Sequence, residues 1–467
     1  MQRWACAAAQ AWLFAGLVSS VIGLLQYFGA AAALSPWVSQ ASPGEAFANL
    51  RQRNQFASLT TMALVALVWL RAGMNGRLAG RHRWAACAAA CLLAAASAAS
   101  SSRTGMIQLV LLCALYGVWG AWRQPAVRRI LVTAVLTYLL ATLALPWLAG
   151  LDLLGHGMFA RLRAGDPSCA SRLTLWSNVL TLIAQKPWLG WGWGELDYAH
   201  YITLYPGARF CDILSNAHNL PLHLAVELGV PLSLVVCGVS VRLVLRARPW
   251  RETDATRQMA WGVLMLILLH SMLEYPLWYG PFQMAFGLCV HLLWSTRSRS
   301  VRAMRLVAAT EPIASIAPVA PVASSAAGIK YFQATSAAAL LLATAYATWD
   351  YHRVSQLYLA PEQRAAAYRE DTLEKTRGTW LFKQQFDFAL LGLTPLTAEN
   401  ALQIHTLSNR LLHFSPEPRV IEKLIESAVR LGRDDEAMLH LARYRAAFPQ
   451  EHARWRSSVV LTEQPAK

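Results

Sequence analysis

Apolar segments of roughly 20 residues, each long enough to cross a hydrocarbon core about 30 Å thick, recur along this chain of 467 residues. They constrain its fold more than any other feature. Because 55% of the residues are hydrophobic and only 15% are charged, we predict an all-α, polytopic helical membrane protein. We expect about nine spans, at residues 5–28, 56–72, 84–100, 105–121, 130–148, 220–241, 259–274, 281–295 and 331–348.

The placement of basic residues predicts how these spans are oriented. The net charge is +16, and the short loops 71–83, 122–129, 242–257 and 296–305 together hold 16 Arg but only two acidic residues. This positive-inside pattern assigns those loops to the cytoplasm. A nucleic-acid-binding face would gather its charge on one domain with interleaved aromatic residues, so we expect no nucleic acid partner. The external segments are then 29–55, 101–104, 149–219, 275–280 and everything after Trp349.

Composition divides the chain into parts. Residues 1–307 form a membrane domain that includes the long external loop 149–219, and residues 308–330 are a linker rich in Pro, Ala and Ser. The last span, 331–348, leads into a charged, amphipathic region, 349–467. There we expect helices at 399–412, 419–431 and 436–448, the last two being an antiparallel pair similar in part to a tetratricopeptide unit. This region is either a cap on the external loops or a docking surface for a protein substrate.

The eight cysteines show no metal-ligand spacing, and six of them lie in apolar segments. Cys169 and Cys211 both lie in the external loop, where a disulfide between them is one of two open alternatives. Glu195 and Asp197 form the nearest acidic motif, which is more typical of a solvated turn than of a metal site. No phosphate-binding glycine loop is found. We therefore expect neither a metal nor a cofactor.

One candidate reactive group stands out at the point where the external loop re-enters an apolar segment. His218 can accept a proton from a hydroxyl and return it. The alternative is an interfacial histidine without chemistry. Arg172 in the loop and Arg103 at the start of a span are both expected at the external face, where guanidinium groups can bind phosphate oxygens bidentately. The alternative for Arg103 is a side chain snorkelling at a helix end.

Further polar residues gather at the same predicted face. Amides at a membrane boundary are costly unless they bond something, which makes Gln52 and Asn54 candidates for substrate contacts. The alternative is a solvated helix start with Asn49 or Asn54 as N-cap. Asn219 is a third candidate for substrate contact, and it or Asn216 could also orient His218. The run from Glu274 to Tyr279 is either part of an aromatic interface belt or a platform for a sugar, with Tyr275 and Tyr279 as hydrogen-bond donors. Glu274 is an acidic residue at the end of a predicted span and close to His270, which favours a polar cavity around it.

Several of these stretches resemble the O-antigen ligase/polymerase superfamily of bacterial envelopes. They are Arg172–Trp176, Lys186–Gly192, Asn216–Asn219 and Glu227–Gly229. Within the superfamily, Gln52–Gln55, His270–Ser271, Leu273–Tyr279 and the external C-terminal helices are most similar to the protein O-oligosaccharyltransferases that glycosylate pilins. Members carry additional spans before the one that begins here at Trp4, so the resemblance also leads us to expect an N-terminally shortened member or an internal start.

The resemblance implies a function and a set of roles. The donor would be an oligosaccharide on undecaprenyl diphosphate, and the acceptor a Ser or Thr hydroxyl of a pilin-like protein at the periplasmic face of the inner membrane. His218 would act as general base, Arg172 and Arg103 would stabilise the leaving diphosphate without a metal, and Gln52, Tyr275 and Tyr279 would position sugar or acceptor. Attack opposite the leaving group predicts inversion at the anomeric carbon. Residues 1–307 would then be the transmembrane catalytic domain, with a periplasmic loop at 149–219.

Two alternatives remain open. A member of the same superfamily could be a ligase onto lipid A core or a polysaccharide polymerase, and the C-terminal region favours a protein acceptor over these. A lipid-linked sugar transporter is the alternative from another class. Transporters place polar residues near the bilayer midplane, often with internal repeats, whereas here the polar residues gather at one predicted face.

Overall fold

A computed structural model describes residues 2–72, 80–152, 157–158, 163, 168–308 and 324–462. These residues are helical or irregular, and no strand occurs among them. The chain divides into two compact units. The first comprises residues 1–172 and 216–310, and the second comprises residues 173–215 and 311–467. The prediction of an all-α protein is confirmed for the described residues.

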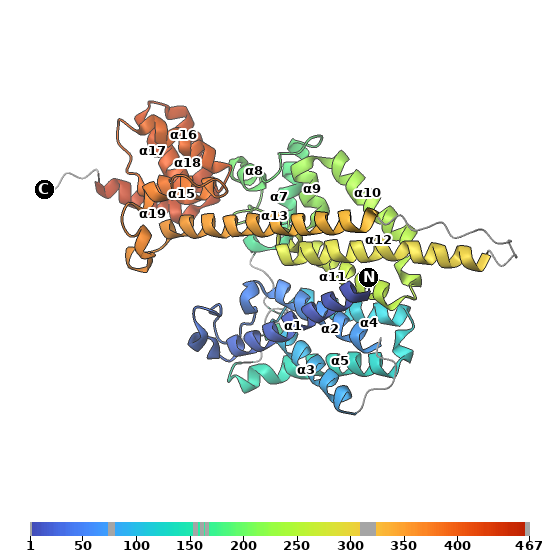
Figure 1. The fold of residues 1–467 in the computed structure, drawn as a ribbon. Helices are drawn as coiled ribbons and strands as arrows, with labels where there is room; N and C mark the ends of the chain where they lie inside the picture. The colour runs from blue at the N-terminus through green and yellow to red at the C-terminus, as the bar shows by residue number, and fades with distance from the viewer. Residues whose placement is uncertain are drawn as a thin grey trace. The chain divides into compact units, whose positions relative to one another are not determined.

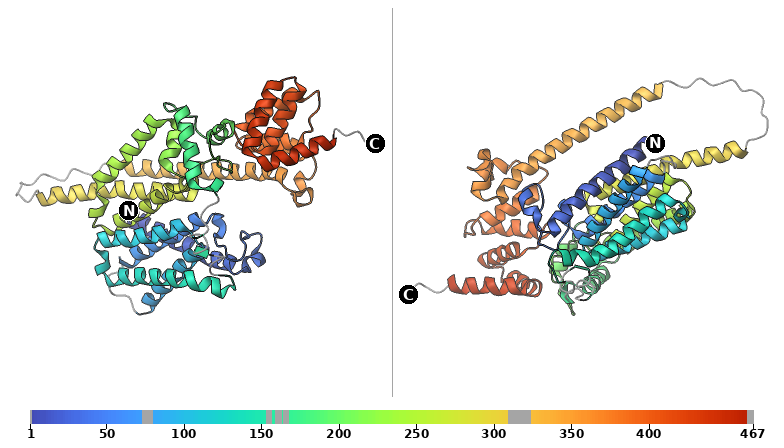
Figure 2. Two further views of the ribbon diagram at one scale, coloured as in Figure 1. Left: turned by 180° about the vertical axis from the view of Figure 1, so that it is seen from behind. Right: turned by 90° about the horizontal axis from the view of Figure 1, so that it is seen from below.

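The first unit is a bundle of long helices. Its helices are α1 (Gln2–Tyr27), α2 (Arg53–Ala72), α3 (Gly80–Ala99), α4 (Arg103–Val118), α5 (Pro125–Leu148), α9 (Leu220–Leu228), α10 (Val230–Ala247), α11 (Ala255–Ser271) and α12 (Gly280–Ala308). Helices α1 to α5 run side by side, as Figures 1 and 2 show. Short 3-10 helices lie between them at Ala30–Leu34, Ala48–Leu50, Ala121–Arg123, Ser168–Ala170, Pro249–Arg251 and Pro276–Trp278.

Helix α2 is the centre of this bundle, packed against α1, α3, α4, α5 and α11. Small residues allow this close packing. A Cβ atom on Gly16 of α1 would lie 2.4 Å from the Cβ of Ala63, and one on Gly105 of α4 would lie 2.5 Å from the Cβ of Ala57. Because Gly105 is in the first turn of α4, this approach brings the starts of α2 and α4 together.

Within the described ranges, four helical segments are long and apolar enough to cross a membrane: Gln2–Tyr27, Arg53–Ala72, Pro125–Leu148 and Val230–Arg251. Two shorter apolar helices, Arg83–Ala99 and Arg103–Val118, accompany them. The sixth span was predicted as one helix over residues 220–241, and this prediction is wrong. It is α9 and α10, separated at Gly229, whose φ of 85° and ψ of 157° suit glycine but few other residues. Pro231, which has no backbone N–H, is the second residue of α10 and lies in its first turn.

The predicted linker is shorter than expected. Helix α12 continues to Ala308, and α13 begins at Ser324 and runs to Ser355, past both ends of the predicted span 331–348. Residues 309–323, which make up most of the predicted linker, lie outside the described residues.

The second unit contains α13 and a cluster of shorter helices (Figure 1). These are α7 (Arg172–Gln185, of which Arg172 belongs to the first unit), α8 (Leu196–Ile202), α14 (Thr372–Thr376), α15 (Lys383–Leu393), α16 (Ala401–Leu412), α17 (Pro418–Arg430), α18 (Asp434–Ala447) and α19 (Pro449–Thr462). Three 3-10 helices, Gln356–Tyr358, Pro361–Gln363 and Ala366–Tyr368, precede α14. The three predicted C-terminal helices are confirmed as α16, α17 and α18, within two residues at each end.

Helix α8, which comes from the loop 149–219 that was predicted to be external, packs into the core of the C-terminal helices. Tyr201 is 1% exposed within a cluster that includes Leu411, Ile421 and Leu424, and its hydroxyl lies 3.0 Å from Nδ1 of His440. This contact agrees with a cap on the external loop, the first of the two alternatives for this region. The loop cysteines Cys169 and Cys211 are disulfide-bonded, whereas the six other cysteines are free.

Candidate active site

Glu274, in the turn after α11, is the common partner of three side chains from distant parts of the first unit. Its Oε1 accepts hydrogen bonds from Nη2 of Arg172 at 2.8 Å and from Nδ2 of Asn54 at 3.0 Å. Its Oε2 lies 2.9 Å from Nδ1 of His218. Ser102, the N-cap of α4, extends the cluster by donating to Oδ1 of Asn54 at 2.6 Å. The starts of α2, α4, α7 and α9 therefore meet around one carboxylate.

The surroundings keep Glu274 charged. Its side chain is only 10% exposed. Burial alone would raise the pKa of this carboxyl, but the hydrogen bond from His218 and the charges of His218, Arg172 and His270 together hold the pKa below its ordinary value. The carboxylate is therefore ionised at neutral pH and accepts a hydrogen bond from the Nδ1–H of His218. In the neutral imidazole, Nε2 is then the basic nitrogen.

The backbone around His218 fixes its ring in place. His218 has a φ of +50°, in the left-handed region that few non-glycine residues adopt. Its N–H donates to Oδ1 of Asn216 at 2.9 Å. Oδ1 of Asn219 accepts from the N–H of Leu222 at 3.2 Å and caps α9, while its Nδ2 donates to the carbonyl of Met272 at 3.3 Å. The side-chain amides of Asn216 and Asn219 therefore hold the turn. Asn219 was expected to contact substrate, but in the structure its amide forms hydrogen bonds within the protein.

His218 also leaves one nitrogen open. Among the described residues its Nε2 makes no hydrogen bond, and its side chain is 28% exposed. An imidazole with a carboxylate on Nδ1 and a free, partly exposed Nε2 is arranged as a general base for a hydroxyl.

The two predicted amides of α2 have different positions. Asn54 belongs to the cluster, where it joins Glu274 to Ser102. Gln52 does not belong to the cluster. Its Oε1 accepts a hydrogen bond at 2.7 Å from the N–H of Gln55, a backbone donor in the first turn of α2 that has no partner within the helix. Sequence patterns did not distinguish these two residues, because both precede the same span.

The predicted arginines lie at two helix starts. Arg172 is the first residue of α7, and its side chain is 29% exposed. Arg103 is the first residue of α4 and directly follows Ser102. The positive ends of helix dipoles, together with guanidinium groups, favour a bound anion. One carboxylate, Glu274, offsets part of this positive charge.

Two tyrosines adjoin the histidine. The ring of Tyr275 meets that of His218 edge to face, with centroids 5.1 Å apart, and stacks on Tyr279 at 5.9 Å. Burial first, and then Tyr279 and Glu274, raise the pKa of Tyr275 to about 12. Its hydroxyl therefore stays protonated, and its hydrogen bond with Tyr279 links the two rings.

The buried pair of His223 and Glu227 was predicted only in part from the sequence. Nε2 of His223 lies 3.4 Å from Oε2 of Glu227, and both side chains are 2% exposed. The N–H of Ala217 points at Nδ1 of His223, 3.5 Å away, and Trp278 meets this ring edge to face at 4.7 Å. The signal for the pair is its i, i+4 spacing inside an apolar helix.

A second buried network lies below His270 in the helix bundle. Oγ of Ser58 is 2.8 Å from Nδ1 of His270 and accepts from Nε2 of Gln108 at 2.8 Å. Gln108 also donates to the carbonyl of Leu266 at 3.1 Å. These side chains join α2, α4 and α11 just beneath Glu274, as expected for a polar site at a span end. Among the described residues, no group of three or more His, Cys, Asp or Glu side chains could hold a metal ion.

Comparisons with known families match most of the chain in three pieces. The family described as "Protein glycosylation ligase" matches residues 46–70, "O-Antigen ligase" matches residues 86–237, and "Virulence factor membrane-bound polymerase, C-terminal" matches residues 258–462. The first two contain Asn54, Ser102, Arg172 and His218, and the third contains Glu274. No solved structure matches the chain significantly.

Two curated relatives come from Acinetobacter baylyi. A "ComP-specific O-oligosaccharyltransferase" is 24% identical over 269 residues, which is 56% of this chain and 46% of the relative. A "General O-oligosaccharyltransferase" is 26% identical over 302 residues, 60% of this chain and 49% of the relative. The chain thus spans about half the length of the curated relatives it matches. The three family matches and the two relatives together show that this chain is similar to the O-antigen ligase/polymerase superfamily, and they support the predicted resemblance to its protein O-oligosaccharyltransferase branch.

Proposed function

We propose that this protein transfers a preassembled glycan from undecaprenyl diphosphate to Ser or Thr hydroxyls of periplasmic, pilin-type proteins. The observation that carries the proposal is the Glu274–His218 pair, 2.9 Å apart, with Arg172 on the same carboxylate. A base and a cation held within one cluster suit a reaction that deprotonates a hydroxyl and releases an anionic leaving group.

His218 supplies the base. Its Nε2 takes the proton of the acceptor hydroxyl as the oxygen attacks the anomeric carbon of the glycan. The new oxygen–carbon bond forms while the bond from carbon to the diphosphate oxygen breaks, and undecaprenyl diphosphate leaves with the electron pair. Glu274 stabilises the imidazolium and holds the ring, as the aspartate does in a Ser-His-Asp triad. Attack from the side opposite the leaving group inverts the anomeric carbon.

Arg172 and Arg103 bind the departing diphosphate, assisted by the positive ends of α4 and α7. Only Nη2 of Arg172 bonds Glu274 in the described residues, so the rest of its fork is available to phosphate oxygens. Negative charge develops on the bridging oxygen as the bond breaks, and fixed guanidinium groups stabilise it without a metal.

The remaining side chains position the reactants. The stacked rings of Tyr275 and Tyr279 provide a flat face for a sugar, with hydroxyls at its rim. Asn54 and Asn219 hold Glu274 and the His218 turn, and we assign Gln52 to the mouth of the site on the strength of its position before α2. For Asn54 and Asn219, these intraprotein contacts replace the direct substrate contacts expected from the sequence.

The proposed location is the bacterial inner membrane, with the site facing the periplasm. The positive-inside pattern of the short loops supports this orientation. The disulfide-bonded Cys169 and Cys211, both in the loop before His218, support an oxidising compartment.

A polysaccharide polymerase or a ligase onto lipid A core is the second candidate. The match of residues 258–462 to the C-terminal part of a membrane-bound polymerase favours it. All of these enzymes would use the same base and leaving group, so only the identity of the acceptor separates them.

Co-expression with a lipid-linked glycan pathway and a candidate pilin tests the proposal. We expect a pilin mass increase equal to one glycan, and its loss in His218→Ala at unchanged protein abundance. His291→Ala, which changes an exposed histidine of α12, is the matched control and should transfer normally. Glycan on lipid A core or longer glycan chains, with unmodified pilin, would support the second candidate. Normal transfer by His218→Ala would refute the assignment of the base.

A further inference from the structure

Helix α10 carries a basic groove at its far end from the candidate active site. The groove has a volume of about 630 Å³, and its described lining is Gly238, Val241, Arg242, Leu245, Arg246 and Arg248. Val230, the first residue of α10, directly follows the break at Gly229 and so adjoins α9 and the His218 turn. The arginines lie in the last turns of the same helix. Nothing in the proposed transfer reaction uses them.

The outer surface of α10 requires a lipid environment. The segment Val230–Arg251 is long and apolar enough to cross a membrane, yet only 6% of its apolar window is buried within the protein. Side chains such as Leu234 (66% exposed) and Leu243 (61% exposed) have no protein neighbours that cover them. An apolar helix exposed to this degree is covered by acyl chains.

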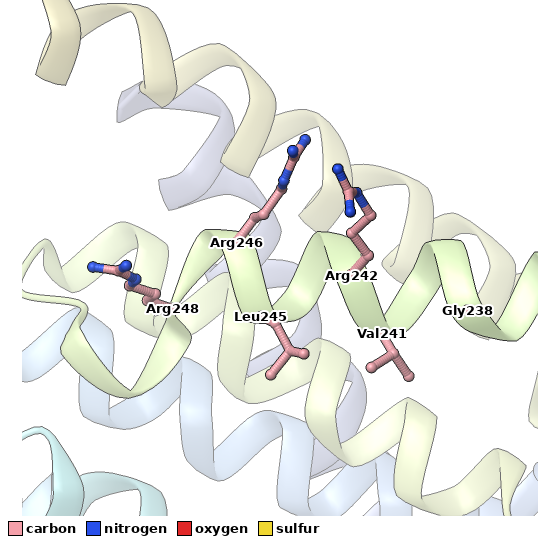
Figure 3. Close-up of a pocket in the computed structure, with 6 residues that line it drawn as sticks. All are labelled: Gly238, Val241, Arg242, Leu245, Arg246 and Arg248. Carbon is pink, nitrogen blue, oxygen red and sulfur yellow. The ribbon is translucent and has the colours of Figure 1, made fainter.

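The groove combines an apolar part with a charged part. Gly238 leaves open space, because a Cβ atom there would meet nothing within 4 Å. Figure 3 shows the guanidinium groups of Arg242 and Arg246 extending side by side from α10, with Val241 and Leu245 directed away from them. Four residues of helix correspond to about 6 Å of rise, a separation that one phosphate group can bridge with two arginines.

The described residues supply no carboxylate partner to the arginines of this groove. In the part of the chain that the structure describes, none of Arg242, Arg246 and Arg248 forms an ion pair with a carboxylate. The nearby Glu252 is engaged by Nε of Arg257 at 2.6 Å. Like charges at i and i+4 on a helix repel each other, so an anion between Arg242 and Arg246 would stabilise this end of α10.

We propose that the groove binds the phosphate head group of an anionic phospholipid in the leaflet opposite the candidate active site. The phosphodiester would lie between Arg242 and Arg246, with Arg248 at the helix end, and an acyl chain would follow Val241 and Leu245 toward the open space at Gly238. Guanidinium groups bind phosphate oxygens bidentately. A basic pocket at a membrane-facing helix end is a recognised arrangement for acidic lipid head groups.

Lipid retention by the full-length protein tests this site. The protein would be purified in mild detergent, mixed with equal amounts of phosphatidylglycerol and phosphatidylcholine, and examined by native mass spectrometry. We expect selective retention of phosphatidylglycerol. In the double variant Arg242→Gln/Arg246→Gln we expect about thirty-fold weaker retention, because each basic residue near an anionic head group contributes about a fivefold effect.

The matched control is Arg128→Gln/Arg129→Gln, which removes the same charge from exposed positions at the start of α5. It should retain phosphatidylglycerol as the unmodified protein does. Equal losses in both double variants would show a general charge effect and overturn the site, as would unchanged retention in the first. Inorganic phosphate provides a further arm: complete displacement of the lipid by millimolar phosphate would overturn the lipid assignment in favour of a free phosphate site.

Discussion

Replacing Glu274 by Gln tests the catalytic arrangement most directly. The substitution keeps the size of the side chain but removes the charge that faces Arg172, His218 and Asn54. A hydrogen bond to a charged group contributes about 1.5–3 kcal/mol. Since about 1.4 kcal/mol corresponds to tenfold in rate, losing the bond to the imidazolium alone lowers kcat by about 10- to 150-fold. Disordering of the His218 ring adds to this, and the corresponding change in a Ser-His-Asp triad costs about 10⁴-fold.

We therefore expect Glu274→Gln to lower kcat for glycan transfer by about 10²- to 10⁴-fold. The assay would use membranes that contain the variant, a lipid-linked oligosaccharide and the acceptor protein, with product followed by intact mass over time. Glu45→Gln is the matched control, because Glu45 also pairs with an arginine, Arg53, but outside the cluster. Transfer by Glu274→Gln within about threefold of the unmodified rate, at equal abundance, would refute the role of this carboxylate.

Three further predictions follow from other features. Arg172→Lys should raise the KM for the lipid-linked donor more than it lowers the maximal rate, since the point charge of lysine cannot replace the bidentate guanidinium group. A donor titration curve identical to that of the unmodified protein would contradict diphosphate binding by Arg172. Gly105→Ala should lower the melting temperature, because its Cβ would lie 2.5 Å from that of Ala57 and overpacking costs about 1–3 kcal/mol; an unchanged melt would contradict the close contact of α2 with α4. Burial lowers the pKa of His200 to about 3 and that of His440 to about 4, so the folded second unit binds protons less readily than the unfolded chain. Its stability should be complete above about pH 6.5 and should fall by about 2 kcal/mol per histidine at pH 5, as measured by thermal unfolding; equal stability at pH 7.5 and pH 5 would contradict the neutral burial of these rings.

Much of the fold follows from hydrophobic patterning, and its exceptions have local causes. Segment length and apolar content predicted where the helices of the first unit lie, because each must bury its backbone polar groups internally. The same patterning missed the division of α9 from α10, since apolar residues continue across Gly229. The Gly229-Val230-Pro231 sequence did contain the signal, as glycine can adopt the required backbone angles and proline favours a helix start.

The candidate site was predictable in its residue types but not in its connections. Asn54, His218 and Glu274 were each recognised as polar groups near the ends of predicted spans, and Arg172 as a cation in the long loop 149–219. Sequence cannot show that the other three share the carboxylate of Glu274, because Asn54 and Glu274 are 220 residues apart along the chain. Ser102, whose hydroxyl completes the cluster, was not among the predicted site residues.

The engagement of Tyr201 by the C-terminal helices affects how deletions should be interpreted. Residues 196–202 complete a folding core whose other members lie beyond position 385. Removing the distal helices would therefore expose Tyr201 and the surface of the loop that contacts His440. It would also leave an apolar strip on the segment that leads to His218. A truncated protein that fails to glycosylate would report misfolding of that segment as readily as loss of an acceptor-recognition surface. Point substitutions on the outward-facing side of α16 to α18, which leave this shared core intact, are the informative alternative.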